Sequence, residues 1–177
     1  MDTLFHGVMG MALCSRTGVA GGRRGPVDDK GRRTVSDWTL WAAFGFGVLP
    51  DLASLGIHFA MGLFNGNGVQ WHGIPDYIFV LYKITHSALG IAVCIGALVA
   101  WRRNLFLPAL AWPLHVLTDI PTHGNGHFLT PILWPFSDGS FVGWSWWLFP
   151  RLFYGGWIVA GLLWVFILVM RLSWRKT

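Results

Sequence analysis

The chain has 177 residues, of which 54% are hydrophobic and only 12% are charged. A disordered chain needs low hydrophobicity and high charge, a disulfide-stapled fold needs more than two cysteines, and soluble domains carry about 25% charged residues. The composition therefore leaves the membrane class, and at this length we expect one domain over 1–177. All eight acidic residues are Asp, so carboxylate chemistry depends on very few positions.

Hydrophobic segments alternate with polar ones along the chain. In chain order the apolar segments are 3–14, 38–64, 84–101, 105–120 and 152–170. We therefore predict an all-α fold, an integral membrane helical bundle of about five transmembrane helices. Pro50 is predicted to kink or break the second segment. The first segment lacks a basic start, so we expect a retained helix instead of a cleaved signal peptide.

The basic residues set the expected orientation. Eleven of the 13 Lys and Arg residues fall in 15–37, 102–104 and 171–177, and the positive-inside rule makes these stretches cytoplasmic. The first of them, 15–37, reads as a flexible cytoplasmic loop because it has few apolar residues to bury. The segments 65–83 and 121–151 then face outside, in a bacterial or archaeal cytoplasmic (inner) membrane. Because the charges are explained by topology, the net charge of +5 does not indicate a nucleic-acid partner.

Ionisable residues inside apolar segments are costly in lipid and indicate function. The topology places several of them at a similar depth toward the outer face: His6, Asp51, His86, His115 and Asp119, followed by His123 and His127. His115 and Asp119 are four residues apart and share one helix face. Histidines and carboxylates with few thiols favour zinc, or else manganese, iron or nickel. We therefore predict a divalent metal site near the outer face.

Other interpretations of these residues stay open. His115 and Asp119 also suit a structural ion pair, and His58 and His72 suit simple hydrogen bonding because they lie beside loops without spaced partners. Lys83 and Arg151 suit either phosphate or lipid-headgroup binding, or ordinary placement at the membrane interface. A non-catalytic metal-binding or transport protein uses the same residue types, although a transporter needs polar groups along a path through the bilayer.

Several motifs together have a familiar order. They are Leu49-Pro50-Asp51, Thr85-His86-Ser87, His115-x3-Asp119, Gly124 and the run from Leu133 to Ser137. This order resembles the YdjM-like family of inner-membrane metal-dependent hydrolases. It is more distantly similar to the zinc-dependent phospholipase C and nuclease P1 group.

These resemblances imply a set of roles. One zinc ion would be held by Asp51, His86, His115 and Asp119, and Asp119 would bridge to a second ion held by His6, with His123 or His127 as a further ligand. Asp51 and Asp119 would be the catalytic residues, with Asp51 taking a proton from water. The implied reaction is hydrolysis of a phosphoester in a lipid or lipid-linked substrate, with membrane lipids as partners.

Overall fold

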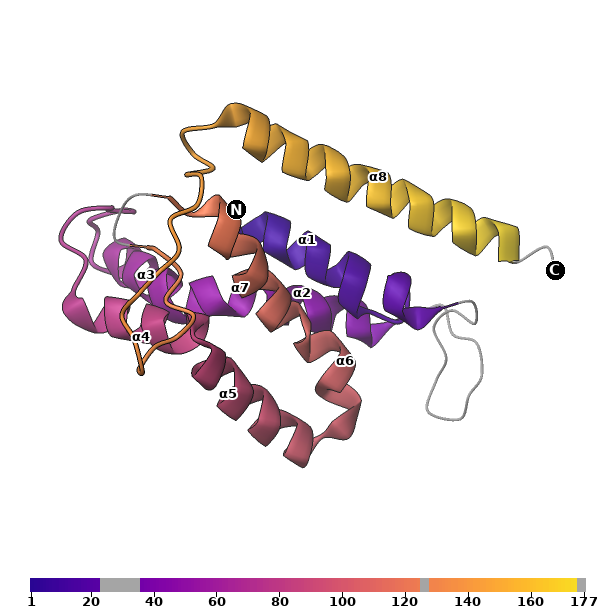
Figure 1. Ribbon diagram of the computed structural model, residues 1–177, viewed down its shortest axis with the longest axis horizontal. Helices are drawn as coiled ribbons and strands as arrows, with labels where there is room; N and C mark the ends of the chain where they lie inside the picture. Colours follow the sequence, from indigo (N-terminus) through magenta and orange to yellow (C-terminus); the bar gives the residue numbers. More distant parts are fainter. Residues whose placement is uncertain (23–35, 125–127, 175–177) are drawn as a thin grey trace.

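The computed structural model describes residues 1–22, 36–124 and 128–174, which form helices joined by turns and irregular segments, without a strand. The helices of this part of the chain are α1 (Thr3–Cys14), α2 (Trp38–Asp51), α3 (Ile57–Phe64), α4 (Asp76–His86), α5 (Ala88–Trp101), α6 (Phe106–Ala109), α7 (Ala111–Thr122) and α8 (Pro150–Trp174), as drawn in Figure 1. The predicted all-α class is confirmed. Most of the loop 15–37 lies outside the described residues, as does His127.

Two helices are long and apolar enough to cross a membrane, namely the continuous helix Trp38–Phe64 and Pro150–Ser173 within α8. The pair α4 and α5 qualifies as a third span if its 68° bend is allowed. By contrast, α1 and α7 have 12 residues each, so they rise only about 18 Å, less than the hydrocarbon core of about 30 Å. The structure thus supports a membrane protein with two or three spans, and five crossings stay a prediction.

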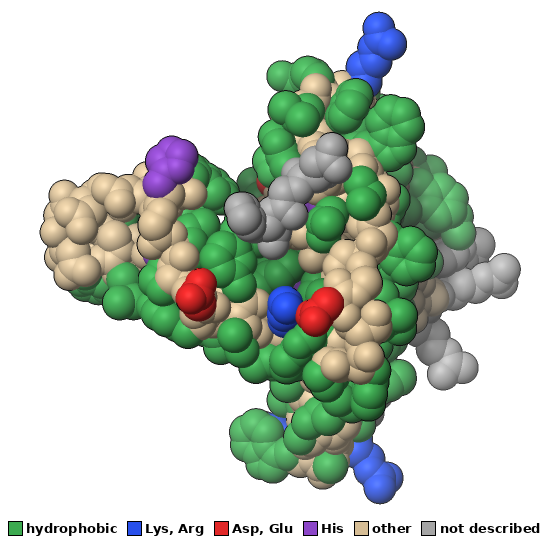
Figure 2. All heavy atoms as spheres, turned by 60° about the vertical axis from the view of Figure 1, so that its left-hand side comes forward, with side chains coloured by type: hydrophobic (Ala, Val, Ile, Leu, Met, Phe, Trp, Pro, Cys, Tyr) green, Lys and Arg blue, Asp and Glu red, His purple; other side chains and the backbone are tan. Residues whose placement is uncertain are grey.

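The outer surface is consistent with this class. On the face shown in Figure 2, apolar side chains dominate and charged side chains are few. Helix α8 lies at the periphery, where Leu162 and Val169 are about 60% exposed. It packs against α1, and Trp157 Nε1 donates a hydrogen bond to Oδ2 of Asp2, the N-cap of α1, at 3.1 Å. Near its other end, the Arg171 guanidinium donates to the carbonyl oxygen of Thr17 at 2.8 Å. The exposed apolar faces are those that a bilayer would cover.

The predicted break at Pro50 does not occur, because the second segment is one helix from Trp38 to Phe64. The chain continues from α2 into α3 through a single π-helical turn, Leu52–Gly56. Within this turn the Ser54 hydroxyl donates a hydrogen bond to the Pro50 carbonyl at 2.9 Å. A second correction concerns 65–83, expected as an outer loop, because its end, from Asp76, is the helix α4.

Glycine allows α1 to cross α2 closely enough to bring their side chains together. A Cβ added at Gly47 would lie 2.6 Å from the backbone oxygen of His6, and one at Gly10 would lie 2.7 Å from that of Ala43. Side chains at these positions would push the two helices apart. The crossing therefore sets how far His6 reaches toward the residues that follow Gly47 on α2.

We predict that Gly47→Ala lowers the free energy of unfolding in detergent micelles by about 1–3 kcal/mol, because the added methyl group overpacks the crossing. Gly45→Ala is the matched control, since an added Cβ at Gly45 meets nothing within 4 Å. That variant should be as stable as the parent or more stable by up to about 1 kcal/mol. Equal stability of the two variants would show that the crossing is not tightly packed.

Candidate metal centre

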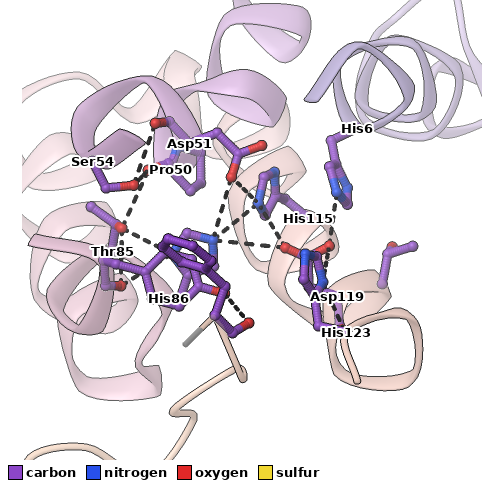
Figure 3. A network of polar contacts seen from close by, with 12 residues as sticks. His6, Pro50, Asp51, Ser54, Thr85, His86, His115, Asp119 and His123 are labelled. Carbon is purple, nitrogen blue, oxygen red and sulfur yellow. Dashed lines mark hydrogen bonds and ion pairs between the residues drawn. The ribbon is translucent and has the colours of Figure 1, made fainter. Parts of the chain in front are cut away.

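Four side chains from three helices converge on one point in the described structure. Asp51, His86, His115 and Asp119 each offer one ligand atom, and these atoms all lie within 4.8 Å of one another (Figure 3). The Nε2 atoms of His86 and His115 are 3.2 Å apart. This cluster of two imidazoles and two carboxylates can hold a metal ion.

Helix ends place two of the four ligands. Asp51 is the last residue of α2, immediately before the π-helical turn. His86 is the last residue of α4, because Ser87 adopts an extended conformation and its side chain caps the start of α5 at Gly90 N. His115 and Asp119 lie one turn apart on α7, and their Nε2 and Oδ2 atoms are 3.1 Å apart.

Backbone carbonyls fix the orientation of both histidine rings. His115 Nδ1 lies 2.6 Å from the carbonyl oxygen of Gly47, and His86 Nδ1 lies 3.1 Å from that of Tyr82. A carbonyl only accepts hydrogen bonds, so each of these contacts is made with the proton on Nδ1. When both rings are neutral in that tautomer, both Nε2 lone pairs face the cluster, and the 3.2 Å approach of the two Nε2 atoms is a contact between two ligand atoms. This is the arrangement in which metal-binding histidines are normally held.

The spacing of the donor atoms suits a small tetrahedral ion. Zinc bonds of about 2.0–2.1 Å place tetrahedral ligand atoms about 3.3 Å apart. His115 Nε2 lies 3.6 Å from Asp51 Oδ1, and His86 Nε2 lies 3.7 Å from Asp119 Oδ2 and 3.8 Å from Asp51 Oδ1. The ligand set therefore fits zinc in both chemistry and spacing, and other divalent ions with nitrogen and oxygen ligands share that chemistry.

The second oxygen of Asp119 faces another group of nitrogen atoms. Its Oδ1 lies 2.9 Å from His6 Nε2, 3.2 Å from His123 Nδ1 and 2.9 Å from the α-amino nitrogen of Met1. The His6 nitrogen is buried and makes no hydrogen bond despite this short distance. A buried nitrogen without a hydrogen bond beside a carboxylate oxygen is the feature expected of a second ligand group.

Asp51 is the most accessible of the four ligands. Its side chain is 18% exposed, against 1% or less for the other three. Its Oδ1 faces the two histidines, while its Oδ2 accepts a hydrogen bond from the Thr3 hydroxyl at 2.6 Å. Asp51 is thus the ligand at which the cluster comes nearest to the molecular surface.

The structure brings together most of the residues that the sequence singled out. His6, Asp51, His86, His115, Asp119 and His123 lie in this one cluster. His127 lies outside the described residues. His58 lies elsewhere, with its ring 3.0 Å from the carbonyl oxygen of Gln70, and Lys83 forms an exposed ion pair with Asp138 at 2.8 Å.

Sequence reasoning missed the groups that surround the ligands. Thr3 and Thr122 contact the cluster through Asp51 and the Met1 amino group, and the ring of Tyr82 stacks on His86 with centroids 3.9 Å apart. Threonine and tyrosine are common in helices of every kind, so nothing in the sequence marked them. The motif Thr85-His86 did carry a signal, because the Thr85 hydroxyl lies 3.0 Å from His86 Nδ1.

Comparison of the chain with protein-family models, with curated proteins and with solved structures finds no match.

We predict that the purified protein binds zinc and that His115→Ala lowers its zinc affinity by more than about 100-fold, because loss of supporting residues alone costs 10–100-fold. Metal content measured by mass spectrometry after dialysis against buffered zinc would test this. His72→Ala, which changes an exposed histidine outside the cluster, is the control. Zinc retained by His115→Ala at the level of the control would contradict the assignment.

Proposed function

We propose that this protein is a membrane-embedded metal-dependent hydrolase that cleaves a phosphoester in a lipid or lipid-linked substrate. The observation that carries the proposal is the set of two carbonyl-oriented histidines facing two aspartates, of which only Asp51 is accessible. Catalytic metal sites differ from structural ones by having an accessible side for water or substrate. The motif order, which resembles that of metal-dependent hydrolases, led to the same expectation from the sequence.

A divalent ion in this cluster would supply a Lewis acid that polarises a phosphoryl oxygen and promotes attack by water. The chain's own residues would do the rest. His86, His115 and Asp119 are buried and position the reacting groups, while the accessible Asp51 accepts the proton of the attacking water. The Thr3 hydroxyl, bonded to Asp51 Oδ2, holds that carboxylate in one orientation.

The proposed hydrolase could use either one metal ion or two. Asp119 presents Oδ2 to His115 and Oδ1 to His6 and His123, so its carboxylate is placed to bridge two sites. Paired ions would clamp both the attacking and the leaving oxygen of a phosphoester. The ratio of zinc to protein distinguishes the two forms of the proposal.

Exposed apolar side chains support a lipid substrate. The end of α3, the loop between α3 and α4 and the segment before α8 carry large ones, among them Phe64, Trp71, Phe136 and Phe141. Aromatic side chains of this kind gather at membrane–water interfaces. Under the proposed topology, these loops lie at the outer membrane–water interface of a bacterial or archaeal cytoplasmic membrane, where lipid headgroups are found.

Transport of the metal is the main rival function. A transport path needs polar groups along the membrane span. Between Trp38 and Pro50, and again from Ala88 to Trp101, the sequence contains no histidine, acidic or basic residue. The ionisable residues gather instead at one end of these helices. This arrangement favours a fixed catalytic site over a transport path through the membrane.

We predict that Asp51→Asn and Asp119→Ala separate metal binding from turnover. Asp119→Ala should abolish both metal content and phosphoester hydrolysis. Asp51→Asn keeps an amide oxygen that can still ligate, so the zinc-loaded variant should hold more metal than Asp119→Ala and still lose more than about 100-fold in rate, as expected when a general base is removed. Hydrolysis of a panel of phospholipids and soluble phosphodiesters by the zinc-loaded protein would be measured.

Asp76→Asn is the control, because Asp76 is exposed at the start of α4 and lies outside the cluster. Full activity of Asp119→Ala would contradict the proposal. A zinc-binding parent protein that cleaves no member of the panel would favour the transport or storage function instead.

A further inference from the structure

A cavity of about 460 Å³ lies far from the metal centre, at the other end of α2 and α5. Its lining residues are Trp38, Trp101, Arg102, Asn104 and Leu105. Trp38 begins α2 and Asp51 ends it, and α5 runs from just after His86 to Trp101. At 1.5 Å per residue each helix separates the cavity from the metal centre by about 20 Å. The cavity therefore belongs to a different site.

Cations accompany both tryptophans of this cavity. The Arg102 guanidinium lies 4.9 Å from the centre of the Trp101 ring, and the Arg16 guanidinium lies 5.7 Å from that of Trp38. Arg102 and Asn104 also bring N–H donors to the lining. A planar guanidinium and an amide are the groups that recognise phosphate oxygens. The remaining lining is apolar or aromatic.

The carboxylate nearest in sequence to the cavity residue Trp38 does not face the cavity as a free negative charge that would repel a bound anion. Asp37 directly precedes Trp38, but its side chain is buried and accepts hydrogen bonds from the backbone N–H groups of Thr39 and Thr17. The negative charge of Asp37 is thus compensated by the backbone N–H groups that bind it.

We propose that this cavity binds the phosphate headgroup of an anionic phospholipid. Trp38 begins the membrane-spanning helix Trp38–Phe64, and Trp101 ends the bent pair that forms the third candidate span. The cavity therefore lies at the boundary between hydrocarbon and water, where tryptophan and arginine meet lipid headgroups. A volume of about 460 Å³ is within the range of small-ligand sites. Acyl chains would extend along the exposed apolar faces of α2 and α5, which a soluble anion would not use.

The test is a binding titration of the purified protein in detergent micelles, with native mass spectrometry counting bound lipid. We expect phosphatidylglycerol to bind at least about tenfold more tightly than phosphatidylcholine. Arg102→Gln should weaken phosphatidylglycerol binding by about tenfold, as expected for the loss of a charge-assisted hydrogen bond. The side chains of Arg102 and of its neighbour Arg103 are both exposed, so replacing either one should leave the fold intact.

Arg103→Gln is the matched control, because Arg103 is adjacent in sequence and equally charged but does not line the cavity. It should weaken binding by less than about threefold, the scale of a single surface charge. Equal loss in the two variants, or equal binding of the two lipids, would overturn the proposal. Glycerol phosphate without acyl chains that binds as tightly as phosphatidylglycerol would also overturn it, in favour of a soluble anion.

Discussion

The buried carboxylate of Asp119 is the interaction on which the arrangement of this protein depends. Its side chain is 1% exposed, and removing a carboxylate from water is costly unless charges or hydrogen bonds compensate. His115 from its own helix, His6 from α1, His123 beyond α7 and the amino group of Met1 all contact its two oxygens. The chain start, α1 and α7 are thus held at one point, and a metal ion would compensate the same charge.

Departures from regular helix support this centre. The π-helical turn directly follows Asp51, and the extended residue Ser87 ends α4 at His86. Gly47 serves twice, because its small size admits α1 and its carbonyl oxygen orients His115. Irregular backbone beside functional groups is a common way to aim a side chain that an uninterrupted helix would direct elsewhere. The opposite end of α2 and α5 has aromatic and basic residues suited to a headgroup, so the two ends have separate roles.

The ligands were predictable because charge inside an apolar segment is rare, and an Asp or His in such a segment stands out against leucine and phenylalanine. The all-α class was predictable for the same reason of composition. The path of the chain through Pro50 could not be predicted, because a proline indicates a disturbed helix without specifying a kink, a break or a π-helical turn. Helix α4 was missed because glycine and proline just before it resemble a continuing loop. The number of crossings depends on how the short helices α1 and α7 sit in lipid, which hydropathy alone does not determine.

The central claim is that Asp51, His86, His115 and Asp119 hold one divalent ion. Anomalous diffraction at the zinc edge from crystals of the zinc-loaded protein tests it most directly. The account predicts a peak about 2.0–2.2 Å from the Nε2 atoms of His86 and His115 and from an oxygen of Asp119, with Asp51 on the accessible side. A peak elsewhere, or no peak and a proton shared between the two Nε2 atoms, would contradict it and leave the cluster as a structural hydrogen-bond network.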